Sequence, residues 1–286
     1  MKPIDFTRYP MSNKYYGGSE KKIGILISDS EYMVKFQKKT PFGVRNNHIS
    51  EYLGSHVFLL LSLPAQETYL GYYNQEQVVA CKDFNKAGEQ FVPFNDVGES
   101  TLDQDKERYQ YDYEDIMQML RDNSKITNVN ETISMFWNIY IVDALLGNFD
   151  RHGANWGFIK KENLYSLAPV FDNGSCLYPN LTDENEMMKI MASEEETNKR
   201  VYTFPTSQIR LNRTKSSYYE VIHSLAFSEC NTALLYIHDK MNLKDLYTMI
   251  DDAPLLSDIQ REFYKHMITA RYQKIILESA ILLRGN

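Results

Sequence analysis

A loop rich in polar residues stands between apolar segments near the middle of the chain. The stretch GNFDRHGANWGF, residues 147–158, carries Asp150, Arg151, His152 and Asn155. Such groups are costly to bury and restrictive to order, so a plain connector has little need of them. Phosphoryl transfer asks for a carboxylate that orients a hydroxyl, oxygen ligands for Mg²⁺ and a cation on the phosphates. The loop is therefore a candidate for that chemistry.

The spacing of polar residues agrees with this chemistry. Asp150 stands five positions before Asn155, the separation between the base and a metal-binding Asn in the catalytic loops of protein kinases. Downstream, FDNG supplies Asp172 and Gly174 after two short apolar runs that indicate a hairpin. This is the place where kinases present a metal-binding Asp in a D-F-G turn. A D-x-x-x-x-N match is weak alone, but the two motifs at this distance form a fairly strong signal.

Further candidate groups precede the loop in the order that a nucleotide site needs. Glycines before a strand let main-chain N–H groups approach phosphates; here YYGGSEKK contains Gly17, Gly18 and Ser19. Lys35 in YMVKF is similar to the strand lysine of the V-A-I-K motif. Glu51 lies on the next expected helix, where the partner of that lysine belongs.

The elements that must position these groups can be read from apolar periodicity. Short apolar runs at 23–28 and 32–36 predict one hairpin, and the segment 67–84 predicts another. Between them, residues 47–62 have apolar residues at helical spacing and end before Pro64. We therefore expect a small β-rich lobe over residues 1–84.

The remainder, residues 85–286, is predicted to form a larger helical lobe. Residues 85–110 are polar and irregular, and a helical pattern follows at 113–120. Residues 131–146 are apolar on nearly every face, which predicts a buried helix between Asn130 as N-cap and Gly147 as terminator.

From about 184 onward the sequence favours helices, with a long closing helix at about 255–283. The expected fold class is thus α+β, with two lobes.

Composition excludes several classes of function. The net charge of −7 argues against a nucleic-acid binder, which needs a basic face to neutralise phosphates. The three cysteines form no CxxC pair, which fits a reducing compartment and gives no metal framework. The first residues contain no apolar signal region, and the run VFLLLSLP is too short to span a bilayer. We expect a soluble cytoplasmic protein, although secretion by a dedicated system would leave no readable pattern.

The motifs together resemble those of the HipA-like serine/threonine kinases. The similarity runs from IDFT through YMVKF, SEY, VVACKDF, LLGNFDRH and NWGF to FDNGSCLYP and the closing helices. The resemblance implies a two-lobed kinase fold that binds ATP and Mg²⁺, phosphorylates Ser or Thr and phosphorylates itself. It implies Asp150 as the catalytic base, Asn155 and Asp172 as metal ligands, and Lys35 on the phosphates with Glu51 as its partner. Main-chain groups in the stretch Ala80, Cys81, Lys82 and Asp83 would meet the adenine.

The sequence also departs from better-known kinases. Eukaryotic protein kinases place His-Arg before the catalytic Asp, whereas Arg151 and His152 follow it here. No A-P-E follows the FDNG turn, and the order D-R-H-x-x-N also resembles lipid kinases of the phosphatidylinositol type. His152 stands two residues after Asp150, where many kinases place a lysine near the γ-phosphate. A protonated imidazole there would tie the rate to pH near neutrality.

Alternative interpretations stay open at this stage. Asp150 and Asn155 are also compatible with a polar loop next to a helix, and Gly17, Gly18 and Ser19 with a plain turn. Lys35 and Glu51 would then be solvated charges. The alternative functions are a lipid or small-molecule kinase, or a non-catalytic nucleotide-binding module that meets a partner in a toxin system or a host protein. The expected partner otherwise is a protein substrate with Ser or Thr.

Overall fold

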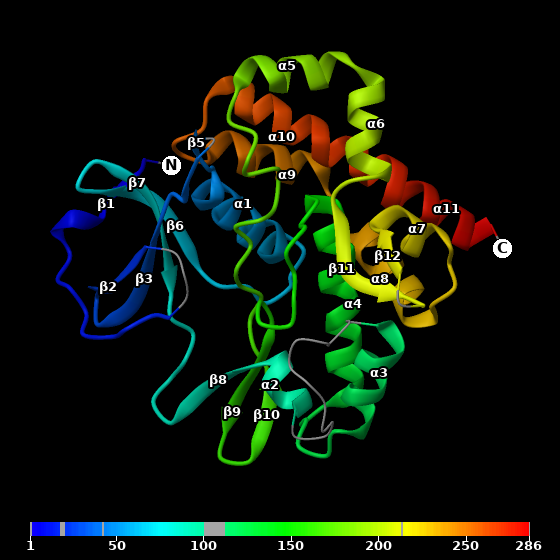
Figure 1. Ribbon diagram of the computed structural model, residues 1–286, viewed down its shortest axis with the longest axis horizontal. Helices are drawn as coiled ribbons and strands as arrows, with labels where there is room; N and C mark the ends of the chain where they lie inside the picture. Colours follow the sequence, from blue (N-terminus) through cyan, green and yellow to red (C-terminus); the bar gives the residue numbers. More distant parts are fainter. Residues whose placement is uncertain (1, 18–20, 42, 100–111, 213, 286) are drawn as a thin grey trace. The chain divides into compact units, whose positions relative to one another are not determined.

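The chain divides into two units, each assembled from segments that are distant in the sequence (Figure 1). The first unit comprises 1–84, 170–197 and 242–269, and the second comprises 85–169, 198–241 and 270–286. The computed structural model describes residues 2–17, 21–41, 43–99, 112–212 and 214–285. The expected division into lobes at residues 84 and 85 stays a prediction.

A five-stranded sheet forms the centre of the first unit. Its strand order is β1-β6-β7-β3-β2, and all neighbours are antiparallel except β1 and β6. The strands are β1 Ile4–Asp5, β2 Lys22–Ile27, β3 Ser30–Phe36, β6 Thr68–Tyr73 and β7 Glu76–Lys82.

Two tight turns set the register of this sheet. Ser28 and Asp29 join β2 to β3 with φ of 46° and 63°, and Asn74 and Gln75 join β6 to β7 with φ of 48° and 68°. Two successive residues with positive φ fit the twist of adjacent antiparallel strands. The two hairpins predicted from the sequence are confirmed.

The side chains of the sheet point alternately to two faces, one that packs in a core cluster and one that meets a helix. Cross-strand partners point to the same side, and the pairs Val34–Ala80 and Phe36–Val78 face one way. They form a buried cluster with Phe6, Ile25 and Tyr32. On the other side, α1 (Asn47–Leu60) packs against β6 and β7. This second face is therefore the one that meets the helix.

The other elements of the first unit are short strands and helices. Helix α1 packs against α9 as well as against the sheet. The elements are η1 Phe6–Arg8, β4 Lys39–Thr40, β5 Gly43–Val44, α5 Glu184–Ala192, the start of α6 Glu194–Tyr202, α9 Leu243–Asp252 and most of α10 Asp258–Arg271.

Helix α4 (Val129–Leu146) is the buried centre of the second unit. Fourteen of its 18 residues are buried, as its apolar sequence predicts. Gly147 ends the helix in the left-handed conformation with φ of 62°, where glycine carries no steric cost. The N-cap is Asn128, whose side chain accepts from Glu131 N, and not Asn130 as expected.

Helices and two small sheets surround α4. It contacts α3 (Tyr113–Asp122), α7 (Tyr218–His223) and α8 (Ser228–Lys240). A three-stranded sheet has the order β10-β9-β8, and a hairpin joins β11 to β12. The strands are β8 Glu89–Pro93, β9 Gly157–Lys161, β10 Leu164–Leu167, β11 Thr206–Leu211 and β12 Thr214–Ser217.

Several expectations for the second unit were wrong. Strand β8 and helix α2 (Phe94–Glu99) lie where irregular structure was expected, and β11 and β12 interrupt the region expected to be helical. The expected closing helix, by contrast, is confirmed, and it consists of α10, a π-helical stretch at Tyr272–Leu277, and α11 (Glu278–Gly285). None of the helices in the described residues is long and apolar enough to cross a membrane.

Candidate active site

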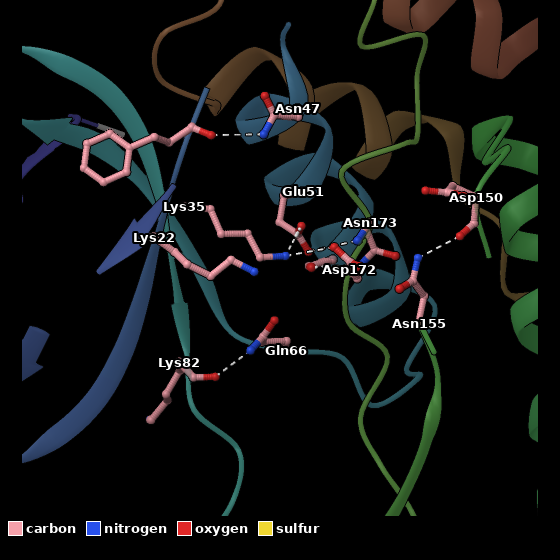
Figure 2. Close-up of polar contacts among 12 residues, drawn as sticks. Lys22, Lys35, Asn47, Glu51, Gln66, Lys82, Asp150, Asn155, Asp172 and Asn173 are labelled. Atoms are coloured by element: carbon pink, nitrogen blue, oxygen red, sulfur yellow. Dashed lines mark hydrogen bonds and ion pairs between the residues drawn. The ribbon is translucent and has the colours of Figure 1, made fainter. Parts of the chain in front are cut away.

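Lys35 forms the centre of the candidate site in the first unit. It lies on the sheet face opposite the core cluster, because its cross-strand partners are Lys22 and Val79. Only 5% of the residue is exposed. Its Nζ donates to Glu51 Oε2 at 2.8 Å and to Asp172 Oδ1 at 2.9 Å (Figure 2). The buried cation therefore joins the sheet, helix α1 and the FDNG turn.

Two carboxylates determine the charge state of Lys35. Burial by itself lowers its pKa, but the nearby carboxylates of Asp172 and Glu51 outweigh that effect and raise the pKa well above its ordinary value. Lys35 is therefore cationic at physiological pH, as a group that binds phosphate oxygens must be.

Glu51 fixes the FDNG turn as well as Lys35. Its Oε1 accepts from Asn173 N at 2.9 Å, and Asn173 Nδ2 donates to Ser55 Oγ at 3.0 Å. Asp172 has φ of 56°, a left-handed conformation that these contacts hold in place. Through Asn173, the FDNG turn is thus anchored on one face of α1.

Gly54 permits this close approach of the turn to α1. A Cβ atom at Gly54 would lie 2.6 Å from Asn173 Cβ, closer than real side chains approach. The helix therefore needs a residue without a side chain at this position.

Lys22 is a cation of the same sheet face that the sequence argument did not single out. It is the cross-strand partner of Lys35, and its Nζ donates to Gly17 O at 2.8 Å (Figure 2). Two adjacent lysines repel each other, so their pairing suits a site that binds an anion. Gly18 and Ser19, also predicted to bind phosphate, lie outside the described residues.

The residues of the stretch predicted to meet adenine lie on both faces of the sheet. Ala80 belongs to the core cluster, whereas Cys81 pairs with Met33 and shares the face of Lys35. Burial raises the pKa of the Cys81 thiol, so it stays protonated.

The main chain of this stretch already makes hydrogen bonds. Lys82 O accepts from Gln66 Nε2 at 2.8 Å, and Asp83 N donates to Glu31 O at 2.8 Å. The Asp83 carboxylate accepts from Tyr16 OH at 3.1 Å. A nucleotide base would therefore meet a main chain that is already fixed in position, where a carbonyl oxygen can accept a second bond.

The loop after α4 carries Asp150 and Asn155 in the second unit. Asn155 Nδ2 donates to Asp150 O at 2.7 Å (Figure 2), and Asp150 N donates to Asn148 Oδ1 at 3.0 Å. Asn148 O accepts from the hydroxyl of Tyr218 on α7 at 2.7 Å. Hydrogen bonds within the unit therefore set the conformation of the loop on both sides of Asp150.

Arg151 ties the same loop to α4. Its guanidinium donates to both carboxylate oxygens of Asp143, at 2.9 and 3.0 Å, and to Asn155 O at 3.0 Å. Asn148 Nδ2 also donates to Asp143 Oδ1 at 2.9 Å. Asp143 was not singled out from the sequence, although a carboxylate inside an apolar helix is itself a signal of a buried partner.

His152 contacts the loop itself. Its Nδ1 accepts from Ala154 N at 3.2 Å, and its main chain links Asp150 O to Asn155 N. Through these contacts His152 stabilises the conformation of the loop. A direct role of the imidazole on phosphate stays a prediction.

Each unit thus gathers part of the predicted set. The first unit brings together Lys35, Glu51 and Asp172, and the second brings together Asp150, His152 and Asn155. That the two groups serve one reaction stays a prediction.

Each unit offers one oxygen donor of a kind that Mg²⁺ accepts. Asp172 supplies a carboxylate in the first unit and Asn155 an amide oxygen in the second, and Mg²⁺ usually keeps other ligands from phosphates and water. No cluster of three or more His, Cys, Asp or Glu side chains that could hold a metal occurs in the described residues. That the two oxygens bind one Mg²⁺ ion stays a prediction.

Comparisons with known proteins show the family of the chain. The model of the HipA-like C-terminal domain matches residues 15–231. The serine/threonine-protein kinase CtkA of Helicobacter pylori is 34% identical over 285 residues, which cover 96% of this chain and 87% of CtkA.

Solved structures of HipA-like proteins also match this chain. The crystal structure of the H. pylori proinflammatory kinase CtkA matches with a TM-score of 0.90 and 33% identity, over 98% of both chains. The HipA toxin of Shewanella oneidensis, solved with HipB and operator DNA, matches with a TM-score of 0.52 at 13% identity. That match covers 95% of this chain and 67% of the toxin, and it concerns the fold alone. These comparisons support a kinase, and they confirm the α+β, HipA-like fold that the sequence predicted. The chain belongs to the HipA-like C-terminal domain family.

Proposed function

We propose that this chain is an ATP- and Mg²⁺-dependent serine/threonine protein kinase that also phosphorylates itself. The observation that carries the proposal is the buried Lys35 cation, which Glu51 and Asp172 hold at 2.8 and 2.9 Å on the sheet face that meets α1. Buried ion pairs add little to stability on balance, so a functional role is a plausible reason for this one. The name of the 34% identical relative supports the choice of Ser or Thr as acceptor.

The roles of the first unit follow from its contacts. Lys35 would hold the α- and β-phosphates, with Glu51 fixing its direction. Lys22 supports the Gly17 carbonyl next to the predicted phosphate loop, and Ala80 to Asp83 would border the adenine. When bound, ATP supplies the phosphoryl group, and Mg²⁺ neutralises charge on its oxygens.

The roles of the second unit concern the acceptor. Asp150 would orient the Ser or Thr hydroxyl and accept its proton, which typically contributes about 10²- to 10⁴-fold to a rate. Asn155, with Asp172 of the first unit, would supply the protein ligands of Mg²⁺. The loop contacts described above fix the main chain at Asp150, which lowers the entropic cost of reaction.

The decisive experiment incubates the purified protein with γ-labelled ATP and Mg²⁺, without another substrate. We expect label in the protein, on Ser or Thr residues that mass spectrometry can locate. Asp150→Asn should abolish the label while nucleotide affinity stays nearly unchanged, and Asp172→Asn should also weaken the binding of Mg·ATP.

Two other outcomes would replace the proposal. Label that appears only on an added phosphoinositide or small molecule would favour the lipid or small-molecule kinase, which the order of Arg151 and His152 after Asp150 resembles. The absence of both phosphoryl transfer and ATP hydrolysis with Mg²⁺ would favour a non-catalytic nucleotide-binding module that acts through a partner protein.

A further inference from the structure

Two phenylalanine rings stack beside Asp150 in the second unit. Phe149 directly precedes Asp150 in the loop after α4, and Phe204 lies in the segment between α6 and β11. Their ring centroids are 6.1 Å apart, and the ring planes are inclined by 28°, which is a stacked arrangement. This aromatic pair therefore adjoins the residue that is the proposed catalytic base.

The aromatic pair has an exposed face. Phe204 is 52% exposed, and Phe149 is half-buried. A single exposed apolar residue is normal on a protein surface and needs no explanation. Two stacked rings next to a functional carboxylate are less common, and aromatic side chains are enriched where proteins bind other chains. The exposed face is therefore a candidate for contact with a substrate.

Hydrogen bonds fix the main chain at both rings. Gln208 Nε2 on β11 donates to Phe149 O at 2.8 Å. Phe204 N donates to Lys199 O at 3.1 Å at the end of α6, and the next residue, Pro205, is buried. The aromatic pair is thus held in position before a substrate arrives, so contact with it costs little conformational entropy.

The position of the aromatic pair limits which part of a peptide can reach it. Consecutive Cα atoms are about 3.8 Å apart, so Phe149 begins one residue's length from Asp150, and its ring is 6.1 Å from that of Phe204. An extended peptide advances about 3.3 Å per residue. A side chain within about three residues of the acceptor can therefore cover the rings while the acceptor hydroxyl meets Asp150.

The chemistry of the rings favours an apolar side chain over a charged one. A leucine or phenylalanine side chain gains from the apolar area that both partners remove from water. A carboxylate would lose hydration against two rings without gaining a hydrogen bond. A lysine would gain only the weak cation–π contact that an exposed ring offers.

We propose that Phe149 and Phe204 determine the peptide specificity of this chain, by binding an apolar side chain within about three residues of the acceptor Ser or Thr. The inference rests on the proposed function, because it takes the acceptor to be a peptide hydroxyl beside Asp150.

The first test measures phosphorylation of short peptides by the full chain with Mg·ATP. Each peptide carries one serine among alanine and glycine residues, with leucine, lysine or glutamate at a single position near the serine. We expect kcat/KM for the best leucine peptide to exceed that for lysine, glutamate or alanine at the same position by about tenfold. A lack of preference for leucine at every position, or a preference for lysine, would overturn the proposal.

A change of charge at Phe204 supplies the second arm. Phe204→Glu should lower kcat/KM for the leucine peptide about tenfold. Lysine at the same position should then give the better substrate, because the new carboxylate attracts it. A purely structural role of Phe204 would instead lower the rates for all peptides together. An unchanged order of peptides in folded Phe204→Glu would also refute the assignment.

Ile281→Glu is the matched control for this variant. Ile281 is 60% exposed on α11 of the same unit, so the substitution introduces the same charge at another exposed apolar position. It should leave the order of the peptides unchanged. Circular dichroism and urea unfolding check the fold of both variants. Should Phe204→Glu not fold, Phe204→Ser tests the loss of the leucine preference.

Binding without transfer separates this inference from the proposed function. Ligand-observed NMR compares the leucine and glutamate peptides, with the serine replaced by alanine, on the native protein and on Phe204→Glu. We expect the native protein to favour the leucine peptide and the variant to lose that preference. An absence of label with this binding preference intact would refute the kinase function and leave the aromatic pair as a peptide site.

The remaining outcomes count against the aromatic pair. Transfer to peptides without a leucine preference would refute the specificity alone, with the kinase function intact. An absence of label together with equal binding of the two peptides would overturn both proposals. Label on a phosphoinositide and on no peptide would assign the rings to an acyl chain and overturn the peptide site.

Discussion

Arg151 holds Asp143 through two parallel hydrogen bonds, from Nε to Oδ2 at 2.9 Å and from Nη2 to Oδ1 at 3.0 Å. Both side chains are nearly inaccessible to solvent, with 8% and 2% exposed. One partner is on α4 and the other is in the Asp150 loop, so the pair fixes the loop to the buried helix. This explains why an arginine directly follows Asp150 in this chain.

Breaking this pair should destabilise the protein strongly. Asp143→Asn leaves the buried guanidinium without an opposite charge, and we expect a loss of about 3–5 kcal/mol in the free energy of unfolding. Urea denaturation measures the loss. Arg121→Met is the control, because the Arg121–Glu229 pair is partly exposed and should cost less than about 1 kcal/mol. Equal losses in the two variants would contradict a structural role of the buried pair.

Lys35 should matter for both binding and stability. Lys35→Met is expected to abolish phosphoryl transfer and to weaken nucleotide binding, because the phosphates lose their buried cation. It also leaves Glu51, which is 1% exposed, without its cation, at a cost of about 3 kcal/mol. Adding Glu51→Gln should recover part of the stability and none of the activity.

The control for the Lys35 and Glu51 variants is the exposed pair Lys21–Glu76. Lys21→Met should change neither urea stability nor nucleotide affinity by a measurable amount. A double variant of Lys35 and Glu51 that is less stable than Lys35→Met would show that the two side chains do not act as a pair.

Because His48 is buried, we expect the free energy of unfolding to fall at mildly acidic pH. Burial lowers its pKa from an ordinary value of 6.5 to about 4, while a hydrogen bond with Gln77 opposes the shift slightly. Between these values the unfolded chain binds a proton that the folded chain excludes, so the free energy of unfolding falls as the pH falls. The loss amounts to about 3 kcal/mol by pH 4.

Comparison with His48→Gln isolates this contribution. Glutamine can still donate to Gln77 Oε1, which lies 2.9 Å from His48 Nε2, and it does not titrate. Urea unfolding at several pH values between 4 and 7 should show a shallower dependence for the variant. Parallel curves for the two proteins would rule out His48 as the source.

Local patterns predicted those parts of the fold that depend on neighbours in the sequence. The short apolar runs at 23–28 and 32–36, the apolar character of α4 and the terminator Gly147 all express local physical preferences. Strand β8 and the β11–β12 hairpin were missed because they mix polar and apolar residues that are mostly half-buried or exposed, so no alternation marks them. Asn128 was missed as N-cap because Asn130, two residues later, satisfies the same composition rule.

In the candidate site, too, features that depend on neighbours in the sequence could be predicted, and those that depend on distant residues could not. Asp150, Asn155 and Asp172 belong to short motifs, and the two motifs together made them candidates. Lys22 could not be predicted, because its relation to Lys35 depends on the register of β2 and β3 across a turn. Gly54 likewise matters only because the FDNG turn, far away in sequence, approaches α1 closely.

His152 can be tested as an anchor against a direct role on phosphate. Asparagine places an acceptor where His152 Nδ1 accepts from Ala154 N, so His152→Asn should keep the transfer rate within about tenfold of the native rate. His152→Gln offers its amide further out and should be slower than His152→Asn. Rates are measured from pH 6 to 8.

The pH profile decides between the two roles. An anchor predicts that the native protein and His152→Asn share one profile near neutrality. A protonated imidazole on the γ-phosphate predicts instead that both variants lose the native pH dependence together with most of the rate. Unchanged rates and profiles in His152→Gln would exclude the phosphate role.

Gly54 offers a test of the contact between α1 and the FDNG turn. Alanine is favoured over glycine within a helix by about 1 kcal/mol, so Gly54→Ala would stabilise an isolated α1. In the protein the new Cβ would lie 2.6 Å from Asn173 Cβ, and the turn must move. We expect a net loss of about 1–3 kcal/mol and a lower transfer rate, because Asp172 precedes Asn173 directly.

Gly285→Ala is the matched control, since no atom lies within 4 Å of a Cβ at that position in α11. It should leave the rate and the affinity for Mg·ATP unchanged. In Gly54→Ala the affinity for Mg·ATP should fall further than that for ATP without metal, because the displaced carboxylate is the predicted metal ligand. An equal fall in both affinities would place the disturbance at Lys35 rather than at Asp172, since Glu51 holds both the lysine and the turn.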